Sequence, residues 1–212
     1  MARFVALLRG INVSGQRQIA MAALRAGLLA AGLRDVQTYL QSGNVVFESD
    51  ETDPEVVAAA IQARIAADFG HQVEVLVLPC AVMAQIASSN PFAADPAADE
   101  RWFHATLLFR PASAAEFAEL KLPAVPGELA VLSGRVVFLY MPTGYGRSKL
   151  VNGYFERALR TSATTRNWRT VSALAGMCRA DGERDGAAGG DGPEAAGDGS
   201  ASAKPTGPGS VA

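Results

Sequence analysis

The sequence predicts an α+β protein built from two small modules, each an antiparallel sheet with helices packed on one face. The first observation is the order of apolar patterns over residues 3–78, which reads strand, helix, strand, strand, helix, strand. The second is that a similar order begins again after residue 100. The third is that Phe4 to Leu8 is apolar at every position, which is typical of a strand covered on both faces. A chain of 212 residues has room for two such modules.

The first module is predicted over residues 1–94. Its expected strands cover residues 3–13, 35–40, 45–48 and 73–78, and its expected helices cover residues 19–31 and 54–69. Pro54 suits the first position of the second helix, whose apolar stripe includes Val57 and Ile61. This β-α-β-β-α-β order is the split βαβ, or ferredoxin-like, plan. Because the first strand is apolar on both faces, we expect a second body to cover the sheet face that carries no helices.

The second module is predicted over residues 95–180, after a polar connector at residues 95–100. We expect strands at residues 101–109, 128–132 and 135–141, and helices at residues 113–120 and 148–159. Ser113 is the expected N-cap of the first of these helices. A last helix is predicted over residues 167–179, at the place where a fourth strand would complete the repeat. The two modules are expected to pack together through their sheets.

Residues 181–212 differ from the rest in composition. They contain six acidic and two basic residues and no large apolar residue except Val211. Such a segment cannot bury enough apolar surface to offset its ordering entropy. We therefore expect a disordered acidic tail rich in Gly, Ala and Pro.

Composition narrows the function classes. A formal net charge of −2 gives no global attraction to nucleic acid or acidic lipid, and no apolar run approaches the length of a membrane span. We expect a soluble cytoplasmic protein in which Cys80 and Cys178 are reduced thiols, since they form no C-x-x-C motif. His71 and His104 have no metal-ligand spacing around them, so we expect no metal and no cofactor.

Positive charge is concentrated in the segment from Gly144 to Arg169. From residue 144 to residue 180 there are seven basic residues and one acidic residue, Glu156. Gly144 to Lys149 has the composition of an anion-binding turn before a helix, with Arg147 and Lys149 as its cations. The alternative is an ordinary turn between a strand and a helix, with solvated cations.

A second helix start follows at residues 164–168. Thr165 and Asn167 are candidate N-caps, and Arg166 adds another cation. If the two helix starts face one another, Arg147, Lys149, Arg166 and Asn167 bind one anion. Trp168 begins an apolar helical stripe, so we assign it to the core and not to a stacking surface.

Four polar residues stand at the ends of the first strand and of the first hairpin: Arg9, Asn12, Ser42 and Asn44. The first and third strands are neighbours in a split βαβ sheet, so these side chains are expected to approach one another. They form either a structural hydrogen-bond network or part of a cleft between the modules. Asn and Ser suit turns for local reasons, which favours the structural network.

Several ordered motifs resemble those of one bacterial family. They are Leu7-Leu8-Arg9-Gly10-Ile11-Asn12-Val13, Thr38 to Phe47 (TYLQSGNVVF), Asn90-Pro91-Phe92, Gly144 to Leu150 (GYGRSKL) and Ala163 to Trp168 (ATTRNW). The chain resembles the family known as domain of unknown function 1697 over about residues 1–178. The resemblance implies a two-part α+β fold with ferredoxin-like topology, and it implies no activity, substrate or cofactor.

These observations lead to one main functional hypothesis and two alternatives. The main hypothesis is that a cleft lined by the basic segment binds an anionic small molecule, such as a nucleotide or another phosphate or carboxylate compound. Weak, sequence-tolerant nucleic-acid binding by the same surface is less favoured, because Phe4 and Phe47 lack the aromatic pattern of an RNA-recognition module. An enzyme without a covalent nucleophile or metal is the other alternative. The sequence leaves the oligomeric state open.

Overall fold

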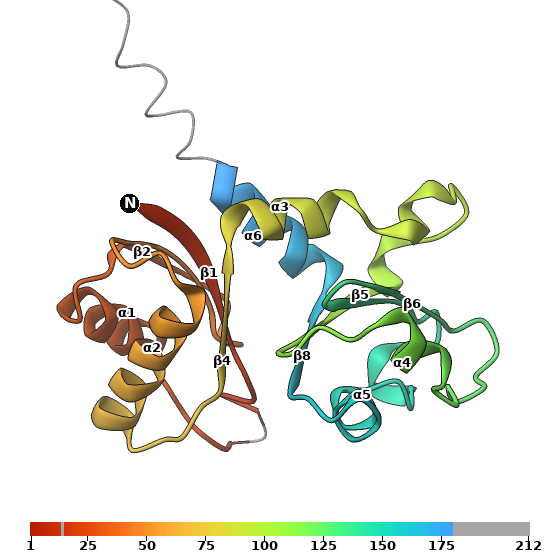
Figure 1. The fold of residues 1–212 in the computed structure, drawn as a ribbon, viewed down its shortest axis with the longest axis horizontal. Coiled ribbons are helices and arrows are strands. Elements are labelled where there is room, and N and C mark those ends of the chain that lie inside the picture. Colours follow the sequence, from red (N-terminus) through yellow and green to blue (C-terminus); the bar gives the residue numbers. More distant parts are fainter. Residues whose placement is uncertain (14, 180–212) are drawn as a thin grey trace, which may run out of the picture.

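The computed structural model describes residues 1–13 and 15–179 and contains two four-stranded antiparallel sheets with helices packed against them (Figure 1). The α+β class predicted from the sequence is therefore confirmed. The tail predicted for residues 181–212 lies outside the described residues. Within the described ranges, none of the helices combines the length and the apolar composition that a membrane span needs.

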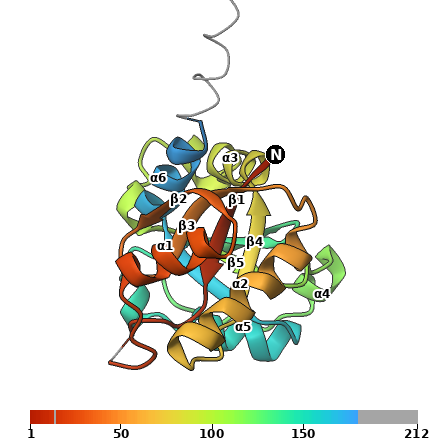
Figure 2. The ribbon, with the colours of Figure 1, turned by 90° about the vertical axis from the view of Figure 1, so that its left-hand side faces the viewer.

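The first half of the chain forms the first sheet, with strand order β2-β3-β1-β4. Its elements are β1 (Ala2–Leu8), α1 (Met21–Ala30), β2 (Arg34–Tyr39), β3 (Asn44–Ser49), α2 (Pro54–Phe69) and β4 (Val75–Pro79). The central strand β1 alternates its side chains between two cores. Phe4 and Leu8 pack with α1 and α2, whereas Val5 and Leu7 belong to a core shared with the second sheet. Figure 2 shows α1 and α2 in front of the first sheet, on the side away from the second half.

The second half forms the second sheet, with strand order β6-β7-β5-β8. Its elements are η2 (Glu100–Trp102), β5 (Phe103–Leu108), α4 (Ala114–Ala118), β6 (Leu129–Ser133), β7 (Val136–Tyr140), η3 (Tyr145–Arg147), α5 (Asn152–Leu159), β8 (Ala163–Asn167) and α6 (Trp168–Arg179). As predicted, Ser113 caps α4; its hydroxyl accepts from the Glu116 N–H at 3.1 Å.

The strand β8 corrects the sequence prediction, which had no fourth strand in this half and placed a helix start at residues 164–168. Residues 163–167 instead pair with residues 104–108 of β5, with Thr165 opposite Thr106. β-Branched residues such as Thr164 and Thr165 fit a pleated strand well. The last helix, α6, then begins at Trp168, one residue later than predicted.

The inner faces of the two sheets and two helices share one core. The helices are α3 (Cys80–Ser88), which follows β4, and α6; in Figure 1 both lie at the top of the molecule and bridge the two halves. The core includes Leu76 of the first sheet, Phe138 of the second and Leu174 of α6. Trp168 is buried against the ring of Phe103, with the ring centroids 6.2 Å apart, which confirms its assignment to the core. The predicted cover over the first sheet is thus the second half of the chain together with α3 and α6.

The cysteines contradict the sequence prediction of two reduced thiols. Cys80 at the start of α3 and Cys178 near the end of α6 form a disulfide, with their Cα atoms 5.4 Å apart. Since 98 residues separate the two in sequence, only the packing of α3 against α6 reveals that they meet. The disulfide joins the two helices at the ends that lie nearest the first sheet (Figure 1).

We predict that reduction of this disulfide lowers stability substantially. Closing a loop of 98 residues restricts the unfolded chain by about 4–5 kcal/mol in the chain-entropy model, so dithiothreitol is expected to lower Tm by about 10 °C. The measurement is thermal unfolding of protein purified without reductant. The control is the double variant Cys80→Ala/Cys178→Ala, which should unfold at the lower temperature with or without reductant. The prediction would be contradicted if an alkylating reagent modified both cysteines of the native protein and dithiothreitol left its Tm unchanged.

Candidate functional site

Arg166 is the buried cation at the junction of the two halves. It lies in β8 and is 8% exposed. Strand alternation turns Thr164 and Arg166 toward the first half and Thr165 toward the opposite face. The side chain of Thr165 accordingly contacts Thr106 and Asn152 of the second half.

Every N–H group of the Arg166 guanidinium has an acceptor. A guanidinium carries five N–H donors, and residues from both halves supply neutral oxygen atoms to them. Burial lowers the pKa of Arg166 to about 10, so the side chain is still charged at neutral pH. The acceptors are Asn44 Oδ1 at 2.6 Å from Nε, Thr164 Oγ1 at 2.7 Å and Thr165 O at 3.0 Å from Nη1, and Leu8 O at 2.9 Å and Ser42 O at 3.2 Å from Nη2. Arg166 would have to release one of these acceptors before it could bind a ligand.

Asn44 and Ser42 hold the first hairpin in the shape that Arg166 requires. Asn44 is fully buried, and its amide donates to Tyr39 O and Ser42 Oγ, both at 2.9 Å. Between them, Gly43 has φ +74°, and a Cβ placed there would lie 2.7 Å from Leu8 Cβ. A side chain at Gly43 would therefore collide with the strand whose carbonyl accepts from Arg166. Of the four residues expected to form a structural network, Ser42 and Asn44 do belong to one. The cation of that network is Arg166.

Asn12 organises a separate loop. Its side-chain amide donates to Ile19 O at 3.0 Å and to Gln41 O at 2.8 Å, and its Oδ1 accepts from the Ile19 N–H at 2.8 Å. Its backbone has φ +54°, a conformation that Asn tolerates better than most residues. Asn12 therefore fixes the approach to α1 and is not a partner of Arg166.

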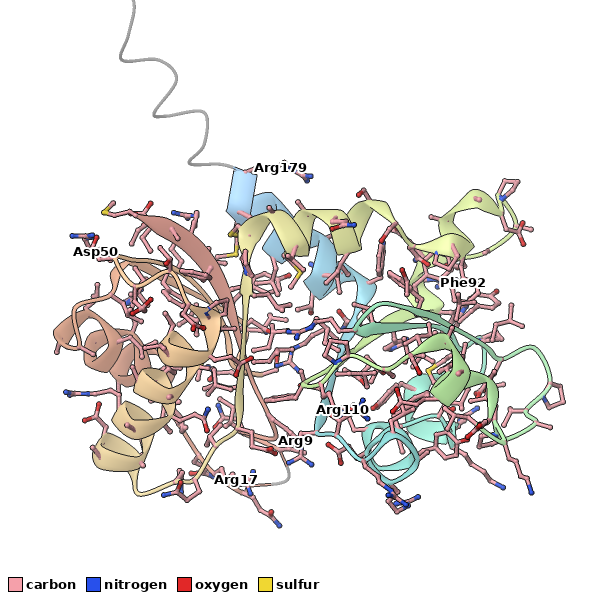
Figure 3. The ribbon with its side chains drawn as sticks, in the orientation of Figure 1. Arg9, Arg17, Asp50, Phe92, Arg110 and Arg179 are labelled. Carbon is pink, nitrogen blue, oxygen red and sulfur yellow. A yellow bond between two sulfur atoms is a disulfide. The ribbon has the colours of Figure 1, made fainter. Side chains whose placement is uncertain are left out.

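Arg9 forms a second connection between the halves. It follows β1, and Figure 3 shows its side chain directed into the space between the halves. Its Nε and Nη2 donate to the two carboxylate oxygens of Glu156 in α5 at 2.8 and 3.0 Å, and its Nη1 lies 3.0 Å from Glu74. Glu74 also accepts from the Ser162 hydroxyl. Arg9 is thus an ion-pair residue between the halves, apart from Asn12, Ser42 and Asn44.

The ion pair affects the pKa values of both groups. Burial alone would raise the pKa of Glu156, but hydrogen bonds from Arg9 and from the Ala163 N–H outweigh it and hold the pKa below its ordinary value. The bonds to Glu156 and Glu74 raise the pKa of Arg9. Glu156, the one acidic residue between residues 144 and 180, is therefore occupied by a cation from the other half.

The turn from Gly144 to Leu150 differs from its prediction. It forms the short η3 and an extended segment, and α5 begins only at Asn152, not at Ser148. The reason lies in Glu128, whose carboxylate accepts from the Ser148 hydroxyl at 2.7 Å, while Ser148 Oγ accepts from the Leu150 N–H at 2.9 Å. Arg147 and Lys149 lie on this turn with exposed side chains.

Strand order brings this turn close to the start of α6. β7 and β8 pair with β5 on opposite sides, and both end beside its first residues, because Phe103 lies opposite Tyr140 and His104 lies opposite Asn167. Tyr145 of the turn stacks on His104, with the ring centroids 5.2 Å apart. Burial lowers the pKa of His104, which favours its neutral form.

A groove lies at the N-terminus of α6. Its volume is about 480 Å³, and its lining residues are Glu100, Arg101, Asn167, Trp168, Arg169 and Ser172. The Asn167 side chain caps α6 by accepting from the Thr170 N–H at 2.9 Å, as the sequence suggested. Arg101 is largely exposed and lies over the Trp102 ring while it contacts Asp99.

Of the four predicted anion-binding residues, the groove contains only Asn167. Arg147 and Lys149 lie on the neighbouring turn, and Arg166 projects into the junction between the halves. Sequence reasoning missed Arg101 and did not single out Arg169. The signal for Arg169 was its place in the first turn of a helix, but the contribution of Arg101 depends on the pairing of β5 with β8. Among the described residues, no group of His, Cys, Asp and Glu has a metal-binding arrangement.

The sequence of this two-sheet protein also matches the model of a known protein family. Residues 1–138 match the family described as Protein of unknown function (DUF1697), a span that runs from β1 into β7. The chain belongs to this family. The family resemblance is thereby confirmed over residues 1–138, a span that ends before the motifs at Gly144 to Leu150 and Ala163 to Trp168, and membership of DUF1697 carries no statement about activity. No curated protein matches the chain in sequence.

A solved structure shows the same overall fold as this DUF1697 protein. It is the conserved bacterial protein SP0830 from Streptococcus pneumoniae, which is 23% identical, with a TM-score of 0.61. The match covers 84% of this chain and 98% of the Streptococcus pneumoniae chain. At this identity the likeness concerns the fold.

We predict that Arg166 is required for stability. Replacing it with Met leaves buried acceptors such as Asn44 Oδ1 and Leu8 O without donors, and each lost partner costs about 1–3 kcal/mol. The Arg166→Met variant is therefore expected to lose about 3–5 kcal/mol in urea-induced unfolding. Arg166→Lys keeps the charge but has fewer donors, so its stability should lie between those of the wild type and Arg166→Met. The matched control is Arg169→Ala, an exposed site three residues away, with a change within about 0.5 kcal/mol. Equal stability of Arg166→Met and wild type would refute the role.

The ion pair predicts a pH dependence. The pKa of Glu156 is lower in the folded protein than in the unfolded chain. The carboxylate therefore contributes its full stabilisation at pH values above its pKa in the unfolded chain, and this stabilisation disappears as pH falls through its pKa in the folded protein. We expect Glu156→Gln to destabilise the protein by about 1 kcal/mol at pH 7 and by much less at pH 3. The measurement is chemical unfolding of both proteins at each pH. Arg9→Met should reproduce this pattern. A difference that stays constant across this range would show that the charge of Glu156 is not responsible.

Proposed function

We propose that each half is a ferredoxin-like module, with the boundary between residues 94 and 95 and the second module extending to residue 180. We further propose that the protein binds a small anionic molecule, such as a nucleotide or another phosphate or carboxylate compound. The binding surface is the α6 groove together with the neighbouring turn from Gly144 to Leu150. The proposal refines the hypothesis drawn from the sequence by moving the contact residues.

The observation that carries the proposal is the groove at the start of α6. Two guanidinium groups, those of Arg101 and Arg169, line it beside the first turn of a helix of 12 residues. N–H groups at such a helix end and the helix dipole favour a bound anion. Glu100 is the one acidic lining residue and Asp99 pairs with Arg101, so among the described residues Arg169 is the lining arginine that no ion pair neutralises. Arg147 and Lys149 on the neighbouring turn add to this field, which attracts anions from solution.

Arg166 has a supporting role in this proposal. Three of its five hydrogen bonds, to Asn44, Leu8 and Ser42, fix β8 against the first half, and α6 follows β8 without an intervening residue. The position of the α6 N-terminus therefore depends on Arg166, although its guanidinium is directed into the junction between the halves and does not line the groove. Removal of Arg166 would weaken binding by displacing α6, and Arg166 is a positioning residue.

Base stacking on the first sheet, the usual mode of an RNA-recognition module, is not open to this protein. Phe4 and Phe47 stack on each other with ring centroids 5.9 Å apart, buried in the core beneath α1 and α2. The opposite face of that sheet belongs to the core shared with the second half. Any contact with nucleic acid would therefore rest on surface cations such as Arg169, which is why we favour a small ligand.

The proposal predicts selective loss of ligand response in groove variants. Thermal shift and isothermal titration with ATP, GTP, inorganic phosphate and citrate should identify at least one anion that raises Tm. A ligand at 100 times its Kd stabilises by about 2.7 kcal/mol, so the shift should be several degrees. Arg169→Ala and Arg101→Ala should each weaken binding about tenfold, because each removes one charged contact.

The matched control is Arg17→Ala, which removes an exposed arginine from the first half. It should leave both Tm and ligand response unchanged. The proposal fails if no anion stabilises the wild type, or if Arg169→Ala responds like the wild type. A short single-stranded oligonucleotide serves as a further ligand. Binding of the oligonucleotide alone, with affinity that falls steeply as salt rises, would replace the proposal with nucleic-acid binding.

A further inference from the structure

The outer edge of the second sheet is open for pairing with another strand. β6 lies at this edge, since the strand order is β6-β7-β5-β8 and β7 is its neighbour. Its residues, Leu129 to Ser133 (LAVLS), include no charged residue and no proline. Leu129 and Val131 are 52% and 39% exposed, which is unusual for large apolar side chains next to a core. Natural edge strands normally carry features that prevent pairing.

The other edge strands do carry such features. β2 starts with Arg34 and Asp35 and has a register irregularity in its pairing with β3. β4 ends at Pro79 and is followed directly by α3. β8 contains Arg166, which binds the first half. In the described structure, β6 is thus the one edge strand without a charge, a proline or an irregularity.

The backbone groups that β6 leaves unpaired can be identified from its register. Gly134 and Arg135 form a two-residue turn, so Ser133 and Val136 close the hairpin as a hydrogen-bonded pair. Since bonded and non-bonded pairs alternate in an antiparallel ladder, Val131 also bonds to β7. The N–H and C=O groups of Ala130 and Leu132 therefore point away from β7, toward the open edge.

We propose that β6 pairs antiparallel with β6 of a second copy of this chain, about a two-fold axis at Val131. Ala130 of each copy then lies opposite Leu132 of the other, and the two pairs satisfy the free backbone groups of both strands. Val131 lies opposite its own counterpart, so two exposed apolar side chains cover one another. This arrangement joins the second sheets of two copies into one continuous sheet. It is independent of the anion-binding groove.

Charge at the ends of β6 supports a second copy as the occupant. Glu128, a half-buried carboxylate that accepts from the Thr143 and Ser148 hydroxyls, precedes the strand, and Arg135 follows it. Antiparallel pairing about Val131 places Gly134 opposite Glu128, so the Arg135 end of one copy meets the Glu128 end of the other. The symmetry repeats this contact at both ends. A strand that is its own charge complement favours self-association over pairing with an unrelated peptide.

The experiment is a charge-swap at the two-fold axis, measured by sedimentation equilibrium and by light scattering after gel filtration. The wild type is expected to approach twice its monomer mass of 22.1 kDa at protein concentrations of about 0.1 mM. Val131→Lys and Val131→Glu should each be monomeric, because like charges would face each other across the axis. An equimolar mixture of the two variants should restore the dimer.

Circular dichroism of each variant confirms that it is folded, and Val56→Lys serves as the control. Val56 is a comparably exposed apolar residue in α2, so its replacement should leave the dimer intact. A wild type that stays monomeric at 0.3 mM would overturn the proposal. It would equally be overturned if both single variants remained dimeric, or if their mixture remained monomeric.

Discussion

The structure depends on the guanidinium of Arg166, a buried positive charge whose five N–H groups bond to oxygen atoms from both halves. No carboxylate is among its acceptors, so the charge is stabilised by carbonyl, hydroxyl and amide dipoles. Three of these acceptors belong to the buried residues Leu8, Asn44 and Thr164, and losing their donor would leave buried polar groups unsatisfied. The network therefore fixes β8 against the end of β1 and the first hairpin. Because α6 follows β8 directly, the same network determines where α6 lies in the core.

The placement of α6 also explains why the space between the sheets is not a ligand cleft. The inner faces of both sheets are apolar apart from the Arg166 network, and α3 and α6 complete the core between them. Arg9 and its two carboxylate partners connect the halves near the C-terminal end of β1, away from α3. The groove that combines two arginines with a helix start lies instead at the end of the second sheet. A shared core thus moves the candidate site from the junction to this end.

Sequence patterns predicted the first half well because its strands and helices have clear apolar periods, as in Phe4 to Leu8 and in Val57 and Ile61. They did not predict β8, whose Thr-Thr-Arg-Asn residues are polar and offer no alternation of apolar side chains. The disulfide between Cys80 and Cys178 depends on the packing of α3 with α6, which no local pattern reports. The ion pair of Arg9 could not be predicted from local sequence either, since its partner Glu156 is 147 residues away in the chain. Long-range contacts of this kind need the three-dimensional arrangement.

The distribution of charge shows how a basic segment can contain cations with different roles. Glu156 is bound by Arg9, so it does not neutralise the cations around it. Arg166 is surrounded by protein dipoles, and its charge is not accessible to solvent. Arg169, three residues later, is exposed because α6 begins between them and turns its side chain outward. The sum of charges in a segment is therefore a weak guide to a binding site, and the direction of each side chain from its strand or helix determines which cations a ligand can reach.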